Sequence, residues 1–97
     1  MKVEYSKEFE KAVRKLSGKI LASVKKTILE VKAANNVEEL TDCEKLTGYN
    51  RAYRLRIGSL RAFFILQING DTVNFEYLVP RGEAYSKKMQ NNLRRKD

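Results

Sequence analysis

The sequence contains no histidine, no tryptophan, one proline and one cysteine in 97 residues. Without histidine, catalytic triads and dyads that depend on imidazole are excluded, and the most common zinc ligand is missing. The single cysteine, Cys43, excludes an internal disulfide and fits a reducing compartment, so we expect a cytoplasmic protein. No apolar run approaches the ~20 residues of a membrane-spanning helix, and the opening residues, MKVEYSKEFEKAV, lack the apolar stretch of a secretory signal.

Charge and core-forming side chains are well represented. Hydrophobic residues make up 42% of the chain and include five tyrosines and four phenylalanines, enough for the core of one domain spanning residues 1–97. The formal net charge is +8. Residues 1–50 hold nine lysines and one arginine against eight acidic residues, whereas residues 51–97 hold seven arginines and three lysines against four acidic residues. Arginine with few acidic partners is typical of phosphate binding, so we expect the functional site in the second half and a polyanion as its partner.

The apolar pattern of the first half predicts a strand and two helices. Residues 1–6 alternate polar and apolar side chains, which indicates a short strand. Residues 7–16 and 19–34 each place apolar side chains along one helical face, and a Ser-Gly link between them predicts an αα-hairpin that packs on a sheet. Residues 35–50 are polar and irregular, and we interpret them as the connection into that sheet.

The second half predicts an antiparallel meander. Residues 53–57, 60–68 and 72–79 follow a period of two or form a continuous β-prone run, and Gly-Ser and Asn-Gly-Asp segments separate them as hairpin turns. Pro80 ends the last strand. Residues 83–96 predict a short basic helix whose apolar contacts are few. The expected fold is therefore α+β, with a first strand, a helical hairpin, a three-stranded meander packed on the helices and a short final helix.

Four arginines and one tyrosine form the candidate site. Arg54 and Arg56 are two apart on one strand, so both side chains leave the same face, and Arg61 begins the next strand. Arg81 follows the last strand and precedes Tyr85 by four residues. Guanidinium groups converging on one face suit the oxygens of a phosphodiester, and a tyrosine suits stacking on a base. The alternative is that these arginines only form the solvated face of an antiparallel sheet.

The stretch KLTGYNRAYRLRIGSLRAFFIL, followed by VPRGEAYSKK, resembles the RelE/ParE superfamily of toxins from type II toxin–antitoxin systems. The positions that carry the resemblance are Leu46, Gly48, Tyr49, Tyr53, Arg54, Arg56, Gly58, Arg61, Arg81 and Tyr85. The first strand and the helical hairpin also match the architecture of that superfamily, so the likeness covers nearly the whole chain.

The resemblance implies an mRNA endoribonuclease that acts in the ribosomal A site without a metal or other cofactor. Attack by a ribose 2′-hydroxyl on the adjacent phosphate would leave a 2′,3′-cyclic phosphate, or its 3′-phosphate product, and a 5′-hydroxyl. By position, Arg54 and Arg56 would bind phosphate and favour loss of the 2′ proton, and Arg61 would stabilise the transition state. Arg81 would stand near the leaving oxygen, and Tyr85 would stack on or orient a base. The implied partners are a cognate antitoxin in a hetero-oligomeric complex, mRNA and the ribosome, with no membrane.

The proton acceptor is the least defined part of this expectation. Relatives often carry lysines where this chain has Arg54 and Arg56, and an arginine is a poor proton acceptor. By position, Glu83 is a candidate base and Glu76 is a weaker one. Cys43 is a weak candidate for a reactive thiol, because the chain has no histidine to activate it. Two other functions stay open at this point: a ParE-like inhibitor of DNA gyrase, and a catalytically inactive relative that only binds RNA.

Overall fold

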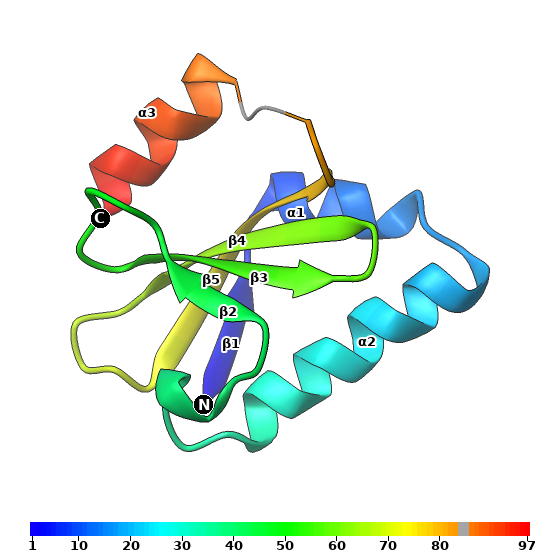
Figure 1. The fold of residues 1–97 in the computed structure, drawn as a ribbon, viewed down its shortest axis with the longest axis horizontal. Helices are drawn as coiled ribbons and strands as arrows, with labels where there is room; N and C mark the ends of the chain where they lie inside the picture. The colour runs from blue at the N-terminus through cyan, green and yellow to red at the C-terminus, as the bar shows by residue number, and fades with distance from the viewer. Residues whose placement is uncertain (84–85) are drawn as a thin grey trace.

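The computed structural model describes residues 1–83 and 86–97 and contains a five-stranded sheet in the order β1-β5-β4-β3-β2 (Figure 1). The strands are β1 (Lys2–Tyr5), β2 (Cys43–Lys45), β3 (Ala52–Ile57), β4 (Leu60–Leu66) and β5 (Thr72–Pro80). Strands β3, β4 and β5 form the antiparallel meander that the sequence predicts. Strand β1 lies parallel to β5 at one edge of the sheet, and β2 lies antiparallel to β3 at the other.

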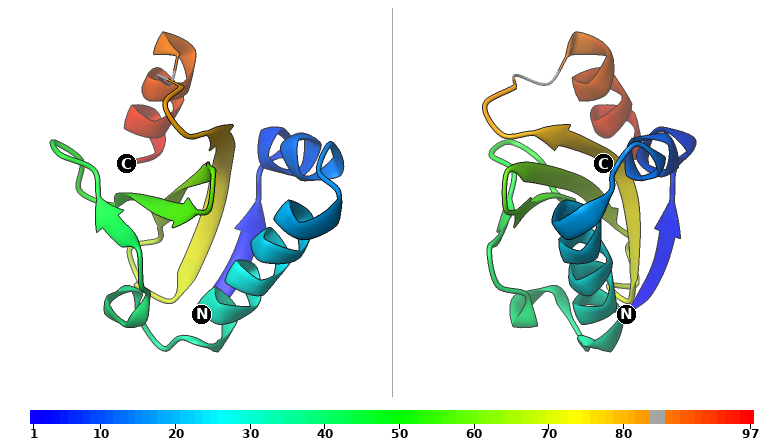
Figure 2. Two further views of the ribbon diagram at one scale, coloured as in Figure 1. Left: turned by 45° about the vertical axis from the view of Figure 1, so that its right-hand side comes forward. Right: turned by 90° about the vertical axis from the view of Figure 1, so that its right-hand side faces the viewer.

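Helices cover both faces of this sheet. They are α1 (Lys7–Arg14), α2 (Gly18–Ala33), the short 3-10 helix η1 (Val37–Glu39) and α3 (Lys87–Lys96). Helices α1 and α2 lie on one face and α3 lies on the other, so the sheet is the middle layer (Figure 2). None of the helices is long and apolar enough to cross a membrane within the described part of the chain. The predicted α+β class is confirmed.

The face under α1 and α2 holds the larger apolar core. Phe9 of α1, Val24 and Val31 of α2, Phe64 of β4 and Phe75 of β5 are 0 to 1% exposed. The rings of Phe9 and Phe75 stack with their centroids 4.9 Å apart. Burial of large apolar side chains of this kind is the main source of stability in a domain of this size. It also fixes which face of each strand turns toward α3.

Helix α3 covers a second, smaller core on the opposite face. The buried members of this core are Leu46, Tyr49, Ala52, Phe63, Ile65, Met89 and Leu93. Met89 and Leu93, the two apolar residues of the predicted final helix, are 5% and 0% exposed, so both side chains dock the helix on the sheet. The helix begins at Lys87 instead of near residue 83, because the Ser86 hydroxyl accepts a hydrogen bond from the Met89 amide and caps it.

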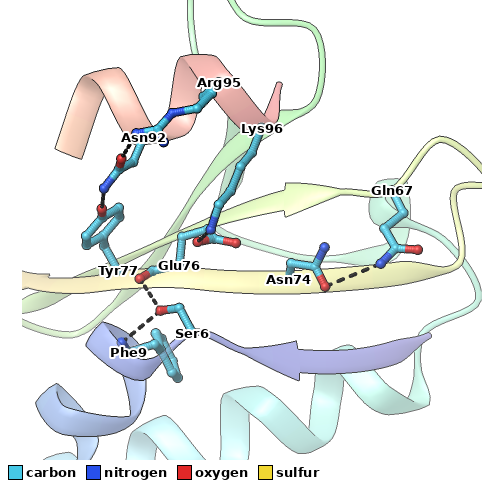
Figure 3. Close-up of polar contacts among 9 residues, drawn as sticks. All are labelled: Ser6, Phe9, Gln67, Asn74, Glu76, Tyr77, Asn92, Arg95 and Lys96. Atoms are coloured by element: carbon cyan, nitrogen blue, oxygen red, sulfur yellow. Dashed lines mark hydrogen bonds and ion pairs between the residues drawn. The ribbon is translucent and has the colours of Figure 1, made fainter. Parts of the chain in front are cut away.

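Polar contacts also hold α3 to the sheet (Figure 3). The Asn92 amide donates to the Tyr77 hydroxyl at 2.6 Å, and Lys96 pairs with the buried Glu76 carboxylate at 2.6 Å. Glu76 is only 6% exposed, and its pairing with Lys96 compensates a carboxylate that would be costly to bury alone.

The last turn of α3 clamps the loop between β2 and β3. The Asp97 carboxylate accepts hydrogen bonds from the Asn50 amide at 2.8 Å and the Arg51 amide at 2.5 Å. The Arg94 guanidinium lies 4.0 Å from the centre of the Tyr49 ring, at cation–π distance. Partial burial opposes ionisation of Asp97, but these two amides, with Arg51 and Arg94 nearby, outweigh it and lower the pKa of Asp97. The clamp fixes the entry into β3, the strand that carries Arg54.

The sheet is wider than the sequence predicts. Strand β2 lies within the segment interpreted as an irregular connection, and at three residues it is too short to show a period of two. Strand β4 ends at Leu66 instead of residue 68, and Ile68 is 86% exposed in the following turn. The difference arises because β-propensity continues past the point at which the strand loses its partner.

The anchoring of α3 can be tested with matched leucine substitutions. Leu93→Ala leaves a cavity in the second core and should lower the free energy of unfolding by about 2–5 kcal/mol. Leu29→Ala makes the same chemical change on α2 at a side chain that is 64% exposed, and should change it by less than about 0.5 kcal/mol. Urea unfolding followed by circular dichroism measures both. Equal effects of the two substitutions would contradict the docking of α3.

The Asp97 clamp predicts a pH-dependent contribution to stability. Because the pKa of Asp97 is lowered in the folded protein, its contribution is present above the unfolded pKa of about 4 and is lost as pH falls through the lower folded value. Asp97→Asn should therefore destabilise the protein at pH 7, and its deficit should shrink as pH falls below about 4. Thermal unfolding at a series of pH values measures this, with Glu8→Gln on α1 as the charge-matched control. A deficit that does not depend on pH would contradict the role of the carboxylate.

Candidate functional site

Strand alternation brings three arginines to the α3 side of the sheet. Leu55 and Ile57 of β3 are buried against α1 and α2, so the residues between and before them, Arg56 and Arg54, face the other way. Arg61 of β4 is the direct cross-strand neighbour of Arg56. The same alternation that builds the main core therefore sets a basic surface on the opposite face.

A hydrogen bond outside the ladders brings Arg81 to this surface. The Arg81 amide donates to the Ser59 carbonyl at 2.6 Å, which ties the segment after β5 to the turn between β3 and β4. Gly82, with φ of 81°, then turns the chain in a conformation that glycine adopts readily.

The four arginines line one open pocket of about 430 Å³, which we call the arginine pocket. Its lining residues are Arg54, Arg56, Arg61, Phe63, Val79, Pro80, Arg81, Gly82 and Glu83. Phe63 and Val79 belong to the second core or pack against it, so the floor of the pocket is fixed by the packing of α3. The walls are charged side chains above a packed floor, an arrangement suited to an anionic ligand that approaches from solvent.

The charges in the arginine pocket act on one another. Partial burial lowers the pKa of Arg61, and the neighbouring charges of Arg56, Arg81 and Arg54 lower it further, while Asp42 opposes them. The Arg61 guanidinium also donates to the carbonyls of Gly58 at 2.9 Å and Leu60 at 2.8 Å, so its position is fixed. Arginine stays protonated at neutral pH despite such a shift. Like charges held this close stabilise a bound anion more than an isolated charge would.

Two carboxylates flank the arginines. Glu83 lines the arginine pocket itself. Glu44 of β2 lies opposite Arg54 in the strand register, and the two side chains form an ion pair at 2.6 Å. Arg54 is the one member of the four that pairs with a carboxylate within residues 1–83 and 86–97.

A second pocket lies beside the first, at the edge of the sheet. This edge pocket has a volume of about 320 Å³ and is lined by Asp42, Cys43, Glu44, Arg54 and Arg56. Arg54 and Arg56 line both pockets and thus form the boundary between them. The edge pocket is the more acidic of the two, because two carboxylates and two arginines line it, whereas one carboxylate and four arginines line the arginine pocket.

The structure places the predicted site residues as follows. Arg54, Arg56, Arg61 and Arg81 come together in the arginine pocket, and their role in catalysis stays a prediction. Tyr85 lies outside the described residues. Tyr49 is buried and Tyr53 stacks on Phe64, with ring centroids 5.2 Å apart, so both tyrosines pack instead of facing the pocket.

The surroundings of Glu76 and Cys43 argue against a catalytic role for either residue. Glu76 pairs with Lys96 and does not line the arginine pocket, which argues against it as a base there. Burial, with the charge of Glu44, raises the pKa of the Cys43 thiol to about 11, so Cys43 is protonated at neutral pH and is a poor nucleophile. Among the residues with described positions, no three potential metal ligands of the acidic, cysteine or histidine type gather in one place.

Sequence reasoning missed the pairing of Glu44 with Arg54. Opposite charges directly across two antiparallel strands are a recognised stabilising pair. Here the pair depends on the pairing of residues 43–45 with residues 53–55, which sets Glu44 against Arg54. The pair was missed because strand β2 was not predicted.

An antiparallel meander with a helical hairpin on one face and an arginine pocket on the other defines the class as an α+β protein with a basic surface pocket. No family model matches the chain. The chain is 34% identical over 86 residues to Toxin RelE3 of Methanocaldococcus jannaschii (strain ATCC 43067), a match that covers 88% of this chain and 96% of that protein. At this identity and coverage the relationship is clear, and the chain belongs to the RelE family of toxins.

Solved structures agree with this assignment. A chain of the crystal structure of the archaeal RelE-RelB complex from Pyrococcus horikoshii OT3 matches with a TM-score of 0.70 and 24% identity, over 86% of this chain and 97% of that chain. A chain of the RelB-RelE antitoxin-toxin complex from Methanococcus jannaschii matches with a TM-score of 0.66 and 28% identity, over 79% and 88% of the two chains. At 24% identity, the first of these two matches supports the fold alone.

Proposed function

We propose that residues 1–97 form a single toxin domain of a type II toxin–antitoxin system, and that the domain cleaves mRNA in the ribosomal A site. The observation that carries the proposal is the arginine pocket, in which four guanidinium groups from three segments of the chain face one open volume. Planar guanidinium groups donate paired hydrogen bonds to phosphate oxygens. Membership of the RelE family supports the reading of this pocket as a phosphodiester site.

Each step of the proposed reaction has a candidate residue. The ribose 2′-hydroxyl loses its proton and its oxygen attacks the adjacent phosphorus, while the bond from phosphorus to the 5′ oxygen breaks. The products are a 2′,3′-cyclic phosphate and a 5′-hydroxyl, whose oxygen takes its proton from water. Arg54 and Arg56 bind the non-bridging oxygens, and Arg61, already fixed by two carbonyls, faces the charge that builds up on the phosphorane. Arg81 stands at the leaving oxygen, and Tyr85 orients a base.

Glu83 is the proposed acceptor of the 2′ proton. Glu83 lines the same pocket as all four arginines, and a carboxylate can accept a proton, whereas a guanidinium cannot act as a base near neutral pH. A positioned general base contributes typically about 10²–10⁴-fold to a rate. The ribosome would add the alignment of the 2′-hydroxyl with the phosphorus, an effect of orientation that this small pocket does not supply alone.

The proposed partner is a cognate antitoxin, in a hetero-oligomeric complex that acts in the cytoplasm. The two matched archaeal structures are complexes of RelE with RelB. The net charge of +8 and the open arginine pocket suit an acidic or amphipathic segment that covers the basic face.

Loss of one arginine tests the nuclease. Arg61→Gln removes a fixed positive charge from the transition state and should lower the rate of mRNA cleavage by about 10²–10³-fold. Arg14→Gln on α1 makes the same change in net charge at an exposed side chain and should leave cleavage unchanged. The measurement is the mapping of new 5′-hydroxyl ends in mRNA after induction of each protein in cells.

Three outcomes would contradict parts of this proposal. Growth arrest with intact mRNA and altered DNA supercoiling would overturn the nuclease and favour a gyrase inhibitor. Binding of RNA without new ends, even on ribosomes, would favour an inactive relative. Equal cleavage by the two variants would show that Arg61 takes no part in the reaction.

The pH profile of cleavage tests Glu83. Glu83→Gln cannot accept a proton, so it should lower kcat by about 10²–10⁴-fold and abolish the fall in rate at acidic pH, while KM changes little. Glu8→Gln on α1 serves as the charge-matched control. An acidic limb that persists in Glu83→Gln would assign the base to another group, on the protein or on the ribosome.

A further inference from the structure

The ion pair between Glu44 and Arg54 lies at the boundary between the arginine pocket and the edge pocket. Glu44 is the cross-strand neighbour of Arg54, and its carboxylate accepts a hydrogen bond from the Arg54 guanidinium at 2.6 Å. The Glu44 side chain is 63% exposed and the Arg54 side chain is 40% exposed, so solvent reaches the pair. The Arg54 side chain also lines the arginine pocket, where the proposed phosphodiester binds.

We infer that Glu44 is an intramolecular competitor that RNA phosphate must displace from Arg54. This inference rests on the proposed function. A guanidinium that already donates to a carboxylate offers fewer N–H groups and a largely compensated charge to a second anion. Binding of phosphate at Arg54 is therefore an exchange, in which the contact to Glu44 is lost as the contact to a phosphate oxygen forms.

The geometry makes the exchange easy to reverse. Exposed ion pairs in water contribute little to stability, so breaking this one carries a small cost. Strand pairing on β2 and β3 keeps the two backbones together when the side chains separate, and Glu44 therefore stays close enough to pair again. No rearrangement of the fold is required.

The position of Glu44 makes it a specificity-determining residue. Arg56, Arg61 and Arg81 have no carboxylate partner among the described ion pairs, so they bind the reacting phosphate without an exchange, whereas Arg54 joins them only after it leaves Glu44. The Glu44 carboxylate therefore lowers the affinity of the protein for free RNA. RNA that is held by additional contacts can still displace Glu44 and bind productively.

A binding experiment with a matched control tests this inference. The probe is a short fluorescent RNA with 2′-O-methyl groups, which has no free 2′-hydroxyl and cannot be cleaved. Glu44→Gln should bind it about 2–5-fold more tightly than the wild type at low salt, measured by fluorescence anisotropy. The control is Glu10→Gln, which removes one negative charge from the exposed pair with Arg14 on α1 and should change the Kd by less than about 1.5-fold.

A double-mutant cycle assigns the effect to Arg54. In an Arg54→Gln background, Glu44→Gln should give no more tightening than Glu10→Gln, because the group for which Glu44 competes is gone. Equal effects of Glu44→Gln and Glu10→Gln in the wild-type background would reduce the result to net charge and overturn the inference. Weaker binding by Glu44→Gln would also overturn it, because Glu44 would then hold Arg54 in its binding position.

The wild type separates a failure of this inference from a failure of the proposed function. If the wild type neither binds the probe nor cleaves ribosome-bound mRNA, the proposed function fails and the inference fails with it. If the wild type binds and cleaves while Glu44→Gln behaves as the control does, the proposed function stands and the competition is refuted.

Discussion

Strand alternation in β3 and β4 is the constraint on which both the fold and the site depend. Residues at alternate positions turn to opposite faces, so burial of Leu55, Ile57 and Phe64 under α1 and α2 forces Arg54 and Arg56 onto the face that α3 shares. A shift of register by one residue would bury the arginines and expose the core. The apolar core and the basic pocket are therefore two consequences of one pattern, and the free energy of core burial also holds the charges together.

The second core explains how a surface pocket can have a fixed floor. Helix α3 packs Met89 and Leu93 on Phe63, and its last turn holds the loop before β3 through Asp97. The arginine pocket begins where this packing ends. Stability on this face and the geometry of the site are thus linked, although Met89, Leu93 and Asp97 do not line the arginine pocket.

The meander and the arginine cluster could be predicted from the sequence because both follow from short-range patterns. A period of two assigns Arg54 and Arg56 to one face, and a tight turn brings Arg61 beside them. The edge strand β2 could not be predicted, since three residues carry too little pattern, and the pair between Glu44 and Arg54 was missed with it. The Asp97 clamp joins residues 46 apart or more and has no local signature. Glu76, which the sequence left open as a weak candidate base, pairs instead with Lys96.

The most direct test of the account is the chemistry of the RNA ends. Purified protein would be mixed with ribosomes that carry a defined mRNA, and the products of a single turnover would be identified by mass spectrometry. A pocket of arginines with a carboxylate predicts a 2′,3′-cyclic phosphate or 3′-phosphate on one fragment and a 5′-hydroxyl on the other. A 3′-hydroxyl with a 5′-phosphate, or intact mRNA, would contradict the proposed role of the arginine pocket.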